Sequence, residues 1–501
     1  MLHRDRADGT QVHSQGAGRE RRLLHILDQT FDIDICNREV PCGIGYAGMF
    51  RSLEPFRRAN PADNNGQRTG VGEHVGFIGN EDERDRIVAS KFLADEGGTN
   101  ELVVGLRGEP AMPNARSLGP DGHTAGVSWQ HLAPAWPPAD VDVDALWTGS
   151  GAKALTAPSV AAPVDVVRHV AGLVRQLDAR GAALAQLAGH QGLGLLTERA
   201  TLLGLPPSGL VSCGGASHLL RAVDGWFAVS LARSDDFRSL PAWLDVDAGA
   251  DPLVDPWALV ESAVRDRTVE DVVETAWLLG LACSAVGEMA DRRAVLVDRI
   301  GPAQPTLLGD LVVVNLASLW AGPLAADILA RLGAQVITVD SSSRPDGARA
   351  TPAFYDRLHD RSTTITLPLA SAAGQEQLAE LLQRVDVVIE GSRPRALAQM
   401  GIDARAVVES GPRLWVSIQS HGRSQKFAHR IGYGDDAAAA GGLVGWHSGE
   451  PRFLADALAD PLAGLSAAAA VVQLVEQGGR WMVDVSLARV AASLADRGGT
   501  R

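Results

Sequence analysis

An aspartate that directly precedes a long run of small residues is the side chain in this sequence best placed to do chemistry. Asp460 and Pro461 come immediately before residues 462–477, which are mostly small and apolar. Aspartate is favoured at the N-cap of a helix and proline at the first helical position, so we expect Asp460 to cap this helix. The positive end of the helix dipole also keeps such a carboxylate ionised, as a carboxylate nucleophile requires. Spacing alone leaves both roles open.

Two arginines form a second candidate site. Arg344 and Arg349 lie in the loop that follows the apolar run at 335–340. A guanidinium group presents a fork of donors that suits phosphate oxygens, so this loop could hold a phosphate-bearing ligand. A solvated surface loop is the other interpretation.

The turn at 319–323 is the third candidate. It joins an apolar run at 311–316 to a helix and reads Leu-Trp-Ala-Gly-Pro, without the G-x-G-x-x-G pattern of dinucleotide sites. We therefore do not expect NAD or FAD. The free N–H groups of a helix N-terminus can still bind an anion, although Pro323 equally suits simple helix initiation.

These candidates depend on a repeated pattern of strands and helices. The runs at 311–316 and 335–340 are typical of buried strands, and the residues between them show a helical apolar face that consists of Leu324, Ala325, Ile328, Leu329 and Leu332. Further strands are expected at 363–369, 385–390 and 413–420, and further helices at 374–384 and 403–410. The pattern predicts a doubly wound, Rossmann-like α/β domain with a parallel sheet, whose ligands bind beyond the carboxyl ends of the strands.

The sequence pattern of residues 1–305 differs from this repeat of strands and helices. Residues 141–305 combine amphipathic helices with a hairpin signal at Asp224-Gly225, which predicts an α+β companion domain. Residues 1–140 show little apolar periodicity and are interpreted as a poorly structured extension. The α/β domain is expected over residues 306–501.

Composition excludes several classes of protein. The net charge is −14, and nucleic-acid binding depends on clustered cations, so we expect no nucleic-acid partner. No apolar run reaches about 18 residues, and the first thirty residues are not an apolar signal, so we expect a cytoplasmic protein without membrane contact. Four scattered cysteines provide neither a disulfide framework nor metal-site spacing, and no metal site is expected.

An ordered set of segments resembles a known family. The segments at 312–340, 363–369, 385–402, 412–422, 432–443 and 459–470 follow the order found in the class III CoA-transferases, also called the CaiB/BaiF family. The resemblance spans roughly 309–493. Segments 150–156 and 219–233 resemble a diverged copy of the family's later portion, and residues 1–140 have no counterpart in it.

The resemblance implies a ping-pong transfer of CoA from an acyl-CoA thioester to a carboxylic acid. Asp460 matches the family's nucleophile, which forms a mixed anhydride and then an aspartyl-CoA thioester. Gly441, Gly442 and Gly445 could shape an oxyanion hole. The positions that match the family's CoA contacts are Leu319, Trp320, Ala321, Arg344, Ser392 and Arg393. The resemblance implies a homodimer and no permanently bound cofactor, because CoA is a substrate.

Two alternatives stay open. Family members that racemise α-methylacyl-CoA use a His-Asp pair where this chain has Gly434 and Asp435, and glycine cannot act as a general base. The other alternative is a non-catalytic acyl-CoA-binding protein that keeps the fold.

Overall fold

The computed structural model describes residues 129–133, 138–246, 255–424, 426–427 and 429–496, together with Arg22, His25 and Ile26. Most of the expected extension, residues 1–140, lies outside these residues. The chain divides into one unit of residues 1–35 and 116–501 and a second unit of residues 36–115. All described residues belong to the first unit.

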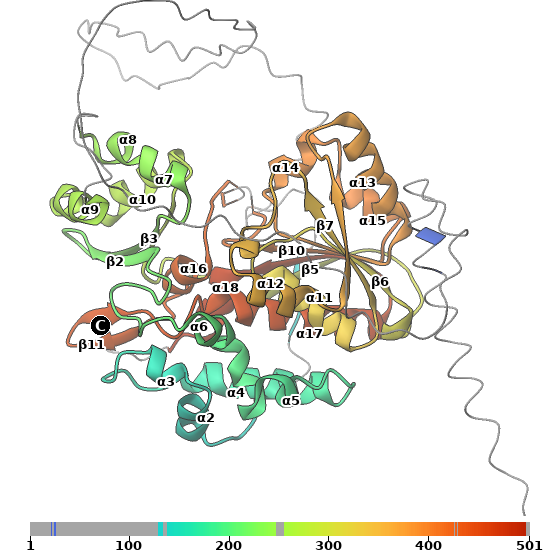
Figure 1. Ribbon diagram of the computed structural model, residues 1–501, viewed down its shortest axis with the longest axis horizontal. Coiled ribbons are helices and arrows are strands. Elements are labelled where there is room, and N and C mark those ends of the chain that lie inside the picture. Colours follow the sequence, from blue (N-terminus) through green and yellow to red (C-terminus); the bar gives the residue numbers. More distant parts are fainter. Residues whose placement is uncertain are drawn as a thin grey trace, which may run out of the picture. The chain divides into compact units, whose positions relative to one another are not determined.

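An eight-stranded sheet is the largest element of the described chain (Figure 1). Six neighbouring strands run parallel. They are β6 (Val312–Asn315), β7 (Gln335–Ser341), β8 (Ser362–Leu367), β9 (Val387–Glu390), β10 (Leu414–Gln419) and β13 (Arg480–Ser486). Their spatial order β8-β7-β6-β9-β10-β13 corresponds to 3-2-1-4-5-6, the order of doubly wound nucleotide-binding sheets. The large parallel α/β sheet expected from the sequence is confirmed.

The sheet continues beyond β13 with two antiparallel strands. β5 (Val295–Gly301) pairs with β13, and β1 (Gln130–His131) pairs with β5. The sheet is therefore mixed and not wholly parallel, which corrects the sequence-based expectation. An antiparallel strand needs no crossover helix, so it can cover the exposed edge of β13 from a distant part of the chain. The domain boundary at 305/306 stays a prediction, although β5, which precedes it, belongs to this sheet.

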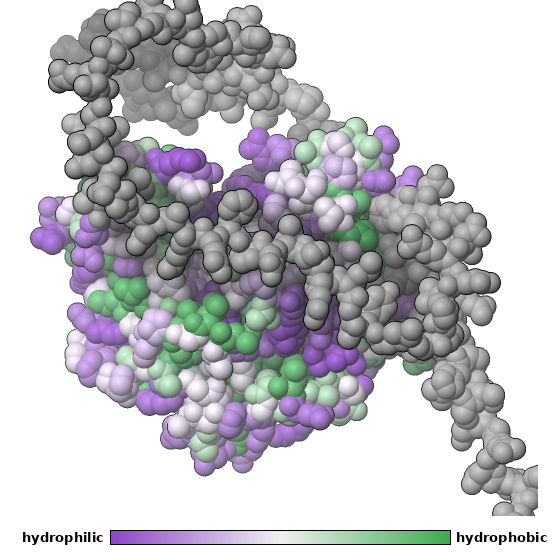
Figure 2. Space-filling model, in the orientation of Figure 1, coloured by the Kyte–Doolittle hydropathy of each residue, from purple (hydrophilic) through white to green (hydrophobic). Residues whose placement is uncertain are grey.

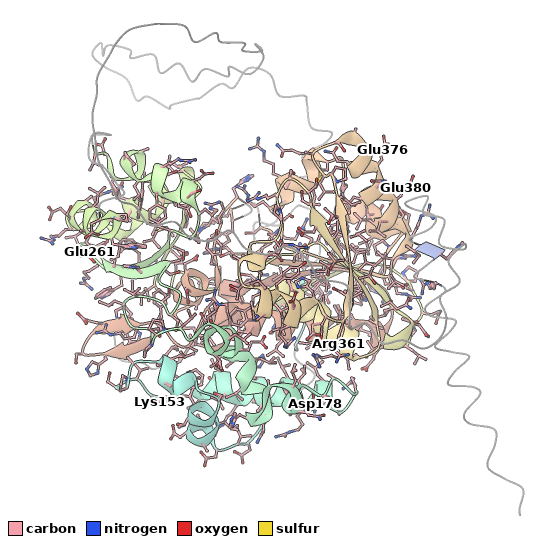
Figure 3. All side chains as sticks on the ribbon, in the orientation of Figure 1. Lys153, Asp178, Glu261, Arg361, Glu376 and Glu380 are labelled. Carbon is pink, nitrogen blue, oxygen red and sulfur yellow. The ribbon has the colours of Figure 1, made fainter. Side chains whose placement is uncertain are left out.

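Helices cover both faces of the sheet, because alternate strand residues point to opposite sides. Val313 lies in a core shared with α11 (Ala321–Arg331) and α17 (Ala459–Gln477). Val312 and Val314 lie in the opposite core, against α13 (Ala372–Arg384). α13 is amphipathic, and Figure 3 shows Glu376 and Glu380 on its exposed side. The other elements of this part are η3 (Leu308–Asp310), η4 (Gly347–Ala350), α12 (Pro352–His359), α14 (Pro394–Gln399), α15 (Ala404–Ser410), α16 (Gly434–Ala440), β11 (Gly445–His447), β12 (Glu450–Arg452) and α18 (Leu487–Leu494).

The middle of the chain, residues 138–292, is called the middle block below. Its hairpin is confirmed: β2 (Ser217–Arg221) and β3 (Trp226–Ser230) pair, and Ala222 N–H donates to Gly225 O at 3.0 Å. β4 (Ala282–Ala285) adds a third antiparallel strand. The helices are α2 (Val143–Gly149), α3 (Ala152–Leu155), α4 (Val164–Asp178), α5 (Leu184–Ala188), η2 (His190–Leu196), α6 (Glu198–Leu203), α7 (Ser234–Arg238), α8 (Leu240–Leu244), α9 (Pro256–Val264) and α10 (Val269–Leu278).

The middle block does not have one hydrophobic core of its own. The buried face of α4 belongs to the same core as α17, whereas β2, β3 and helices α8–α10 form a separate core. Figure 2 shows apolar atoms over α6, where Leu202 and Leu203 are exposed. Among the described helices, none combines the length and apolar character that crossing a membrane requires.

The contact between α11 and α17 is unusually close. A Cβ atom at Gly464 of α17 would lie 2.7 Å from the carbonyl oxygen of Ala321, the first residue of α11. Glycine at this position lets the two helices meet one turn after Asp460. The nucleophile candidate is thereby held beside the first strand-helix turn.

We expect Gly464→Ala to destabilise the protein, although alanine usually favours a helix over glycine by about 1 kcal/mol. The added methyl group would collide with a backbone oxygen, and such overpacking costs about 1–3 kcal/mol. Urea unfolding measures the change. Gly209→Ala is the control, because nothing lies within 4 Å of a Cβ built there. Equal unfolding free energies for Gly464→Ala and the wild type would contradict the close contact.

Candidate active site

Asp460 lies in the first turn of α17, not at its cap. The helix begins at Ala459, so Leu458 is the N-cap residue and Asp460 the second helical residue. This corrects the expected placement of Asp460 at the N-cap and Pro461 at the first position. The physical reason is a tight entry: Ala455 and Ala457 adopt positive φ angles of 49° and 42°, and Ala457 O accepts the N–H of Asp460 at 2.9 Å. Positive φ is costly for alanine, so the surrounding packing must impose this turn.

Gly434, the first residue of α16, faces the Asp460 carboxylate. A Cβ atom at Gly434 would lie 2.5 Å from Oδ2 of Asp460 and 2.3 Å from Ala457 O. A side chain at position 434 would displace the carboxylate. The glycine that removes the general base of a racemase-like pair therefore provides space for Asp460.

Arg199 brings a cation from the middle block to this carboxylate. Its Nε donates to Oδ2 of Asp456 at 2.9 Å, and Nη2 donates to the other oxygen. Asp456 is 1% exposed, whereas the Arg199 side chain is 29% exposed. The guanidinium also lies 5.4 Å from the centre of the Trp320 ring. Arg199 thus joins α6, the approach to α17 and the first strand-helix turn.

Two arginines act on the carboxyl groups around Asp460: Arg199 interacts with Asp435, Asp456 and Asp460, and Arg430 lowers the pKa of Asp436. Burial favours the protonated form of a carboxyl group. Burial raises the pKa of Asp460 to about 7; Arg199 lowers it, while Asp435, Asp436 and Asp456 raise it. Burial also raises the pKa of Asp435 to about 6, and Asp456 adds to that rise. Burial raises the pKa of Asp436 to about 7, although hydrogen bonds from the Tyr433 N–H and the Ser230 hydroxyl lower it. The cluster therefore holds protons near neutral pH and titrates as a coupled group.

Hydroxyl groups of the middle block hold two of these carboxyls. The Ser230 hydroxyl donates to Oδ1 of Asp436 at 2.9 Å, and the Ser217 hydroxyl donates to Oδ2 of Asp435 at 3.3 Å. Oδ2 of Asp436 is buried and has no hydrogen-bond partner among the described residues. A protonated Asp436 avoids an uncompensated buried charge at that oxygen.

The loops after β6 and β9 meet at the topological switch point, where ligands of doubly wound sheets bind. A Cβ at Gly391 would lie 3.4 Å from the Cβ of Ala317, so the two loops are in contact. Leu319 is 42% exposed and adopts a φ of 70°, and its N–H donates to the Asp346 carboxylate at 3.0 Å. The exposed apolar side chain of Leu319 therefore forms an edge of the switch point.

The segment after β9 is fixed by a buried carboxylate. Glu390 accepts the N–H of Ser392 at 2.8 Å and an Arg423 N–H at 3.1 Å. Ser392 O accepts the side-chain N–H of Gln419 at 2.8 Å. Arg393, the N-cap residue of α14, is exposed and makes no ion pair with a described residue. The structure thus places Leu319, Ser392 and Arg393 at one edge of the sheet.

Two predicted contacts differ in exposure from Leu319. Trp320 and Ala321 are 2% and 6% exposed, and the Trp320 ring packs edge-on against Phe354 with centroids 5.0 Å apart. Their side chains support the turn from within, so only their backbone or a limited edge could touch a ligand.

Arg344 and Arg349, the two arginines after β7, differ in their contacts. Arg344 is exposed, makes no ion pair within the described chain, and its charge reaches Tyr433, the residue before α16. Arg349 instead pairs with Asp340 at 2.7 Å and stacks on Tyr355. Arg344 is therefore the available cation of the pair.

The glycines considered for an oxyanion hole lie at the other end of α16. A Cβ at Gly441 would clash with Ala491 and Ala492 of α18, and one at Gly445 would clash with Val160, so both serve close packing. Gly442 has a φ of 76° and forms a turn. Gly434, at the opposite end of the helix, is the glycine that contacts Asp460.

Sequence reasoning missed Arg199, Asp456 and Gly434 as site residues. Arg199 and Asp456 are 257 positions apart and carry no local motif. Gly434 lies in the Gly-Tyr-Gly-Asp-Asp segment, which was a usable signal. Among the described residues, no three His, Cys, Asp or Glu side chains are grouped to hold a metal ion.

Comparison with known proteins adds independent findings. A family model described as CoA-transferase family III matches residues 308–498. The chain is 27% identical over 199 residues to succinyl-CoA–D-citramalate CoA-transferase of Chloroflexus aurantiacus, covering 36% of this chain and 50% of that protein. It is 26% identical over 215 residues to succinate–glutarate CoA-transferase of Agrobacterium fabrum, covering 38% and 54%. The chain thus spans about half the length of these curated relatives.

A solved structure is also similar in part. It is a CaiB/BaiF family protein from Brucella suis, 28% identical, with a TM-score of 0.34 and coverage of 38% of this chain and 55% of that one.

We expect Asp436→Asn to change how stability depends on pH. The pKa of Asp436 is about 7 in the fold and near 3.9 in an unfolded chain. Its protonation therefore stabilises the fold below about pH 4, and this contribution is lost as the pH rises through about 7. Asparagine does not titrate, so the variant should gain about 1.4 kcal/mol relative to wild type per pH unit in this window. Urea unfolding at several pH values measures this, and a pH-independent difference would contradict it.

Proposed function

We propose, on the premise that residues 308–498 belong to CoA-transferase family III, that this chain transfers CoA between an acyl-CoA thioester and a carboxylic acid. The observation that carries the proposal is the Asp460 carboxyl beside Gly434 and Arg199, one helical turn from the switch-point turn. Two relatives are named as CoA-transferases, which supports the reaction class.

In the proposed reaction Asp460 is the nucleophile. One carboxylate oxygen attacks the thioester carbonyl, the carbon–sulfur bond breaks, and CoA leaves as a thiolate, which gives a mixed anhydride. The thiolate then attacks the Asp460 carbonyl carbon and releases the donor acid as a carboxylate. The acceptor carboxylate attacks the carbonyl carbon of the aspartyl thioester, the carbon–sulfur bond breaks, and CoA leaves as a thiolate, which gives a second anhydride. The thiolate then attacks the acceptor acyl carbon of this anhydride, which forms the new acyl-CoA and releases the Asp460 carboxylate.

The surroundings of Asp460 suit this chemistry. A nucleophilic carboxylate must be ionised, and Arg199 is the cation whose charge favours that form. The same charge can stabilise the oxyanion of each tetrahedral intermediate. The absence of a side chain at Gly434 leaves room for an acyl carbonyl beside the carboxylate.

CoA would bind at the switch point. Leu319 supplies an exposed apolar contact, and the exposed Arg344 and Arg393 supply cations for the phosphates of CoA. The backbone N–H and C=O of Ser392 are bonded to Glu390 and Gln419, so its side chain is the part that would contact CoA. CoA is a substrate in this proposal and not a resident cofactor, and the expected homodimer and cytoplasmic location stay predictions.

The site combines groups from both halves of one chain. Arg199 comes from α6 of the middle block, whereas Asp456 and Asp460 come from the segment entering α17. We therefore propose that a single chain supplies nucleophile and cation together.

The decisive variant is Asp460→Asn. It should lower CoA exchange between thioesters and acids by at least about a thousandfold, because the amide is not a nucleophile, while acyl-CoA binding persists. Exchange of labelled CoA and trapping of an aspartyl hydroxamate with hydroxylamine are the measurements. Asp298→Asn is the control, because Asp298 lies on the distant strand β5 and is a buried carboxylate that pairs with Arg405.

Other outcomes would identify the alternatives. Binding of acyl-CoA by wild type without exchange or hydroxamate favours a non-catalytic binding protein. Incorporation of deuterium at the α-carbon favours a racemase.

Arg199→Gln should displace the pH–rate profile. With Asp460 near pKa 7, the rate should fall roughly tenfold for each pH unit below about 7, since only the ionised form reacts. Loss of the Arg199 charge raises the pKa of Asp460, so the rate should begin to fall at a higher pH than in the wild type. Arg199→Lys keeps a positive charge, so its pH–rate profile should stay close to that of the wild type. A profile that does not move in Arg199→Gln would remove Arg199 from this role.

A further inference from the structure

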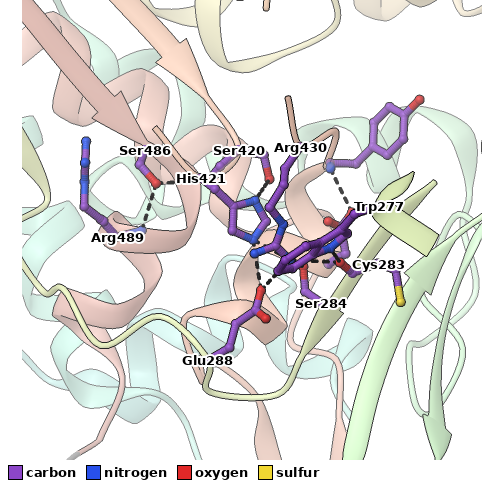
Figure 4. Close-up of polar contacts among 11 residues, drawn as sticks. Trp277, Cys283, Ser284, Glu288, Ser420, His421, Arg430, Ser486 and Arg489 are labelled. Atoms are coloured by element: carbon purple, nitrogen blue, oxygen red, sulfur yellow. Dashed lines mark hydrogen bonds and ion pairs between the residues drawn. The ribbon is translucent and has the colours of Figure 1, made fainter. Parts of the chain in front are cut away.

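A buried polar network joins the middle block to the loop that leads into α16. We call it the Glu288 network; it consists of Trp277, Ser284, Glu288, His421 and Arg430 (Figure 4). The side chains of His421 and Arg430 are 0% and 3% exposed. A buried polar or charged group of this kind needs specific hydrogen-bond or ion-pair partners.

Arg430 is held on several sides. Its Nη2 donates to Oε1 of Glu288 at 2.6 Å and to Cys283 O at 3.0 Å. The guanidinium carbon lies 3.3 Å from the centre of the Trp277 ring, in a stacked cation–π contact. The same Cys283 carbonyl accepts the Trp277 indole N–H at 2.7 Å. β4 and α10 of the middle block therefore hold the guanidinium through Nη2 and its stacked face, whereas Nε is buried and has no hydrogen-bond partner among the described residues.

His421 bridges Glu288 and Ser420. Burial would raise the pKa of Glu288, but hydrogen bonding to His421 and the charge of Arg430 bring it below its ordinary value. Burial lowers the pKa of His421, so the imidazole is neutral. Its Nε2–H then donates to Glu288 at 3.1 Å, and Nδ1 accepts the Ser420 hydroxyl at 2.9 Å.

The backbone on either side of Glu288 is hydrogen-bonded to the C-terminal end of α16. Gly287 N–H donates to Ala439 O, and Met289 N–H donates to Ala440 O, each at 2.9 Å. The Glu288 side chain meanwhile holds His421 and Arg430, which precede α16 in sequence. A single three-residue segment thus fixes both the end of α16 and the loop that enters it.

The loop that leads into α16 is tightly packed at Gly432. A Cβ at Gly432 would lie 2.0 Å from the Ser420 hydroxyl oxygen and 2.6 Å from Oδ2 of Asp436. Two residues later, Gly434 meets the Asp460 carboxylate. A shift of Ser420 or Arg430 would therefore be transmitted to the atoms beside Asp460.

We propose that Glu288, His421 and Arg430 are positioning residues, which set the orientation of α16 so that Gly434 and the Asp435–Asp436 carboxyls lie against Asp460. The inference rests on the proposed CoA transfer and assigns a role in it to residues that touch no reacting atom. It also accounts for the burial of an arginine and a histidine where apolar side chains would fill the space at lower desolvation cost.

The test compares Glu288→Ala and Glu288→Gln with the control Asp298→Asn, which also removes the charge of a buried carboxylate paired with an arginine. We expect Glu288→Ala to lower kcat for CoA exchange by about tenfold to hundredfold. KM for acyl-CoA should change by less than about twofold, because Glu288 makes none of the described hydrogen bonds that hold the switch-point loops. Glu288→Gln keeps an acceptor oxygen and should lose less of kcat.

Hydrogen–deuterium exchange provides a readout that needs no activity. In Glu288→Ala the amides of residues 432–437 should exchange faster, while those of α11 keep wild-type protection. Wild-type protection at 432–437, or an equal loss of kcat in Asp298→Asn, would overturn the positioning role. Failure of wild type to exchange CoA would count against the proposed function, and amide exchange would still decide whether the network orders α16.

Discussion

The ion pair between Arg199 and Asp456 is the interaction on which the candidate site depends. Asp456 is almost completely buried, directly before the helix that carries Asp460, and Arg199 is the cation that makes this burial tolerable. Removing one partner of such a pair costs far more than the pair contributes, because the other charge stays in a low dielectric. The pair therefore fixes α6 against the entry to α17, and with it the contact between the middle block and the sheet domain.

Residues of the middle block contribute contacts to the candidate site. Its serines hold Asp435 and Asp436, its backbone holds the end of α16, and its α4 shares a hydrophobic core with α17. The strand β5, which follows this block, extends the large sheet beyond β13. The candidate nucleophile, the cation and the supporting helix consequently come from distant parts of one chain.

The cluster of Asp435, Asp436 and Asp460 contains the candidate nucleophile and also lowers the stability of the fold when its carboxyl groups are ionised. The carboxyls of Asp435 and Asp436, which are buried, and of Asp460, which is partly exposed, have pKa values near 6 to 7 and favour folding when protonated and oppose it when ionised. A nucleophilic Asp460 needs the ionised form, so the function proposed here requires the state that is less favourable for the fold. Arg199 and the hydroxyls of Ser217 and Ser230 reduce this conflict without removing it. The positive φ angles at Ala455 and Ala457 are a second local cost in the same segment.

The sequence by itself determined the parallel strands, their helices and Asp460 as the residue to examine, because apolar periodicity and helix-start chemistry are local properties. It also indicated the switch-point loops, since these follow from strand order, and the structure brings Leu319, Ser392 and Arg393 to that edge. Only the tertiary structure decided that α17 begins one residue before Asp460, that Arg199 faces Asp456, that Gly434 makes room for the carboxylate, and that β5 joins the sheet. These features depend on contacts between residues far apart in the chain, where burial and charge, and not local propensity, fix the geometry.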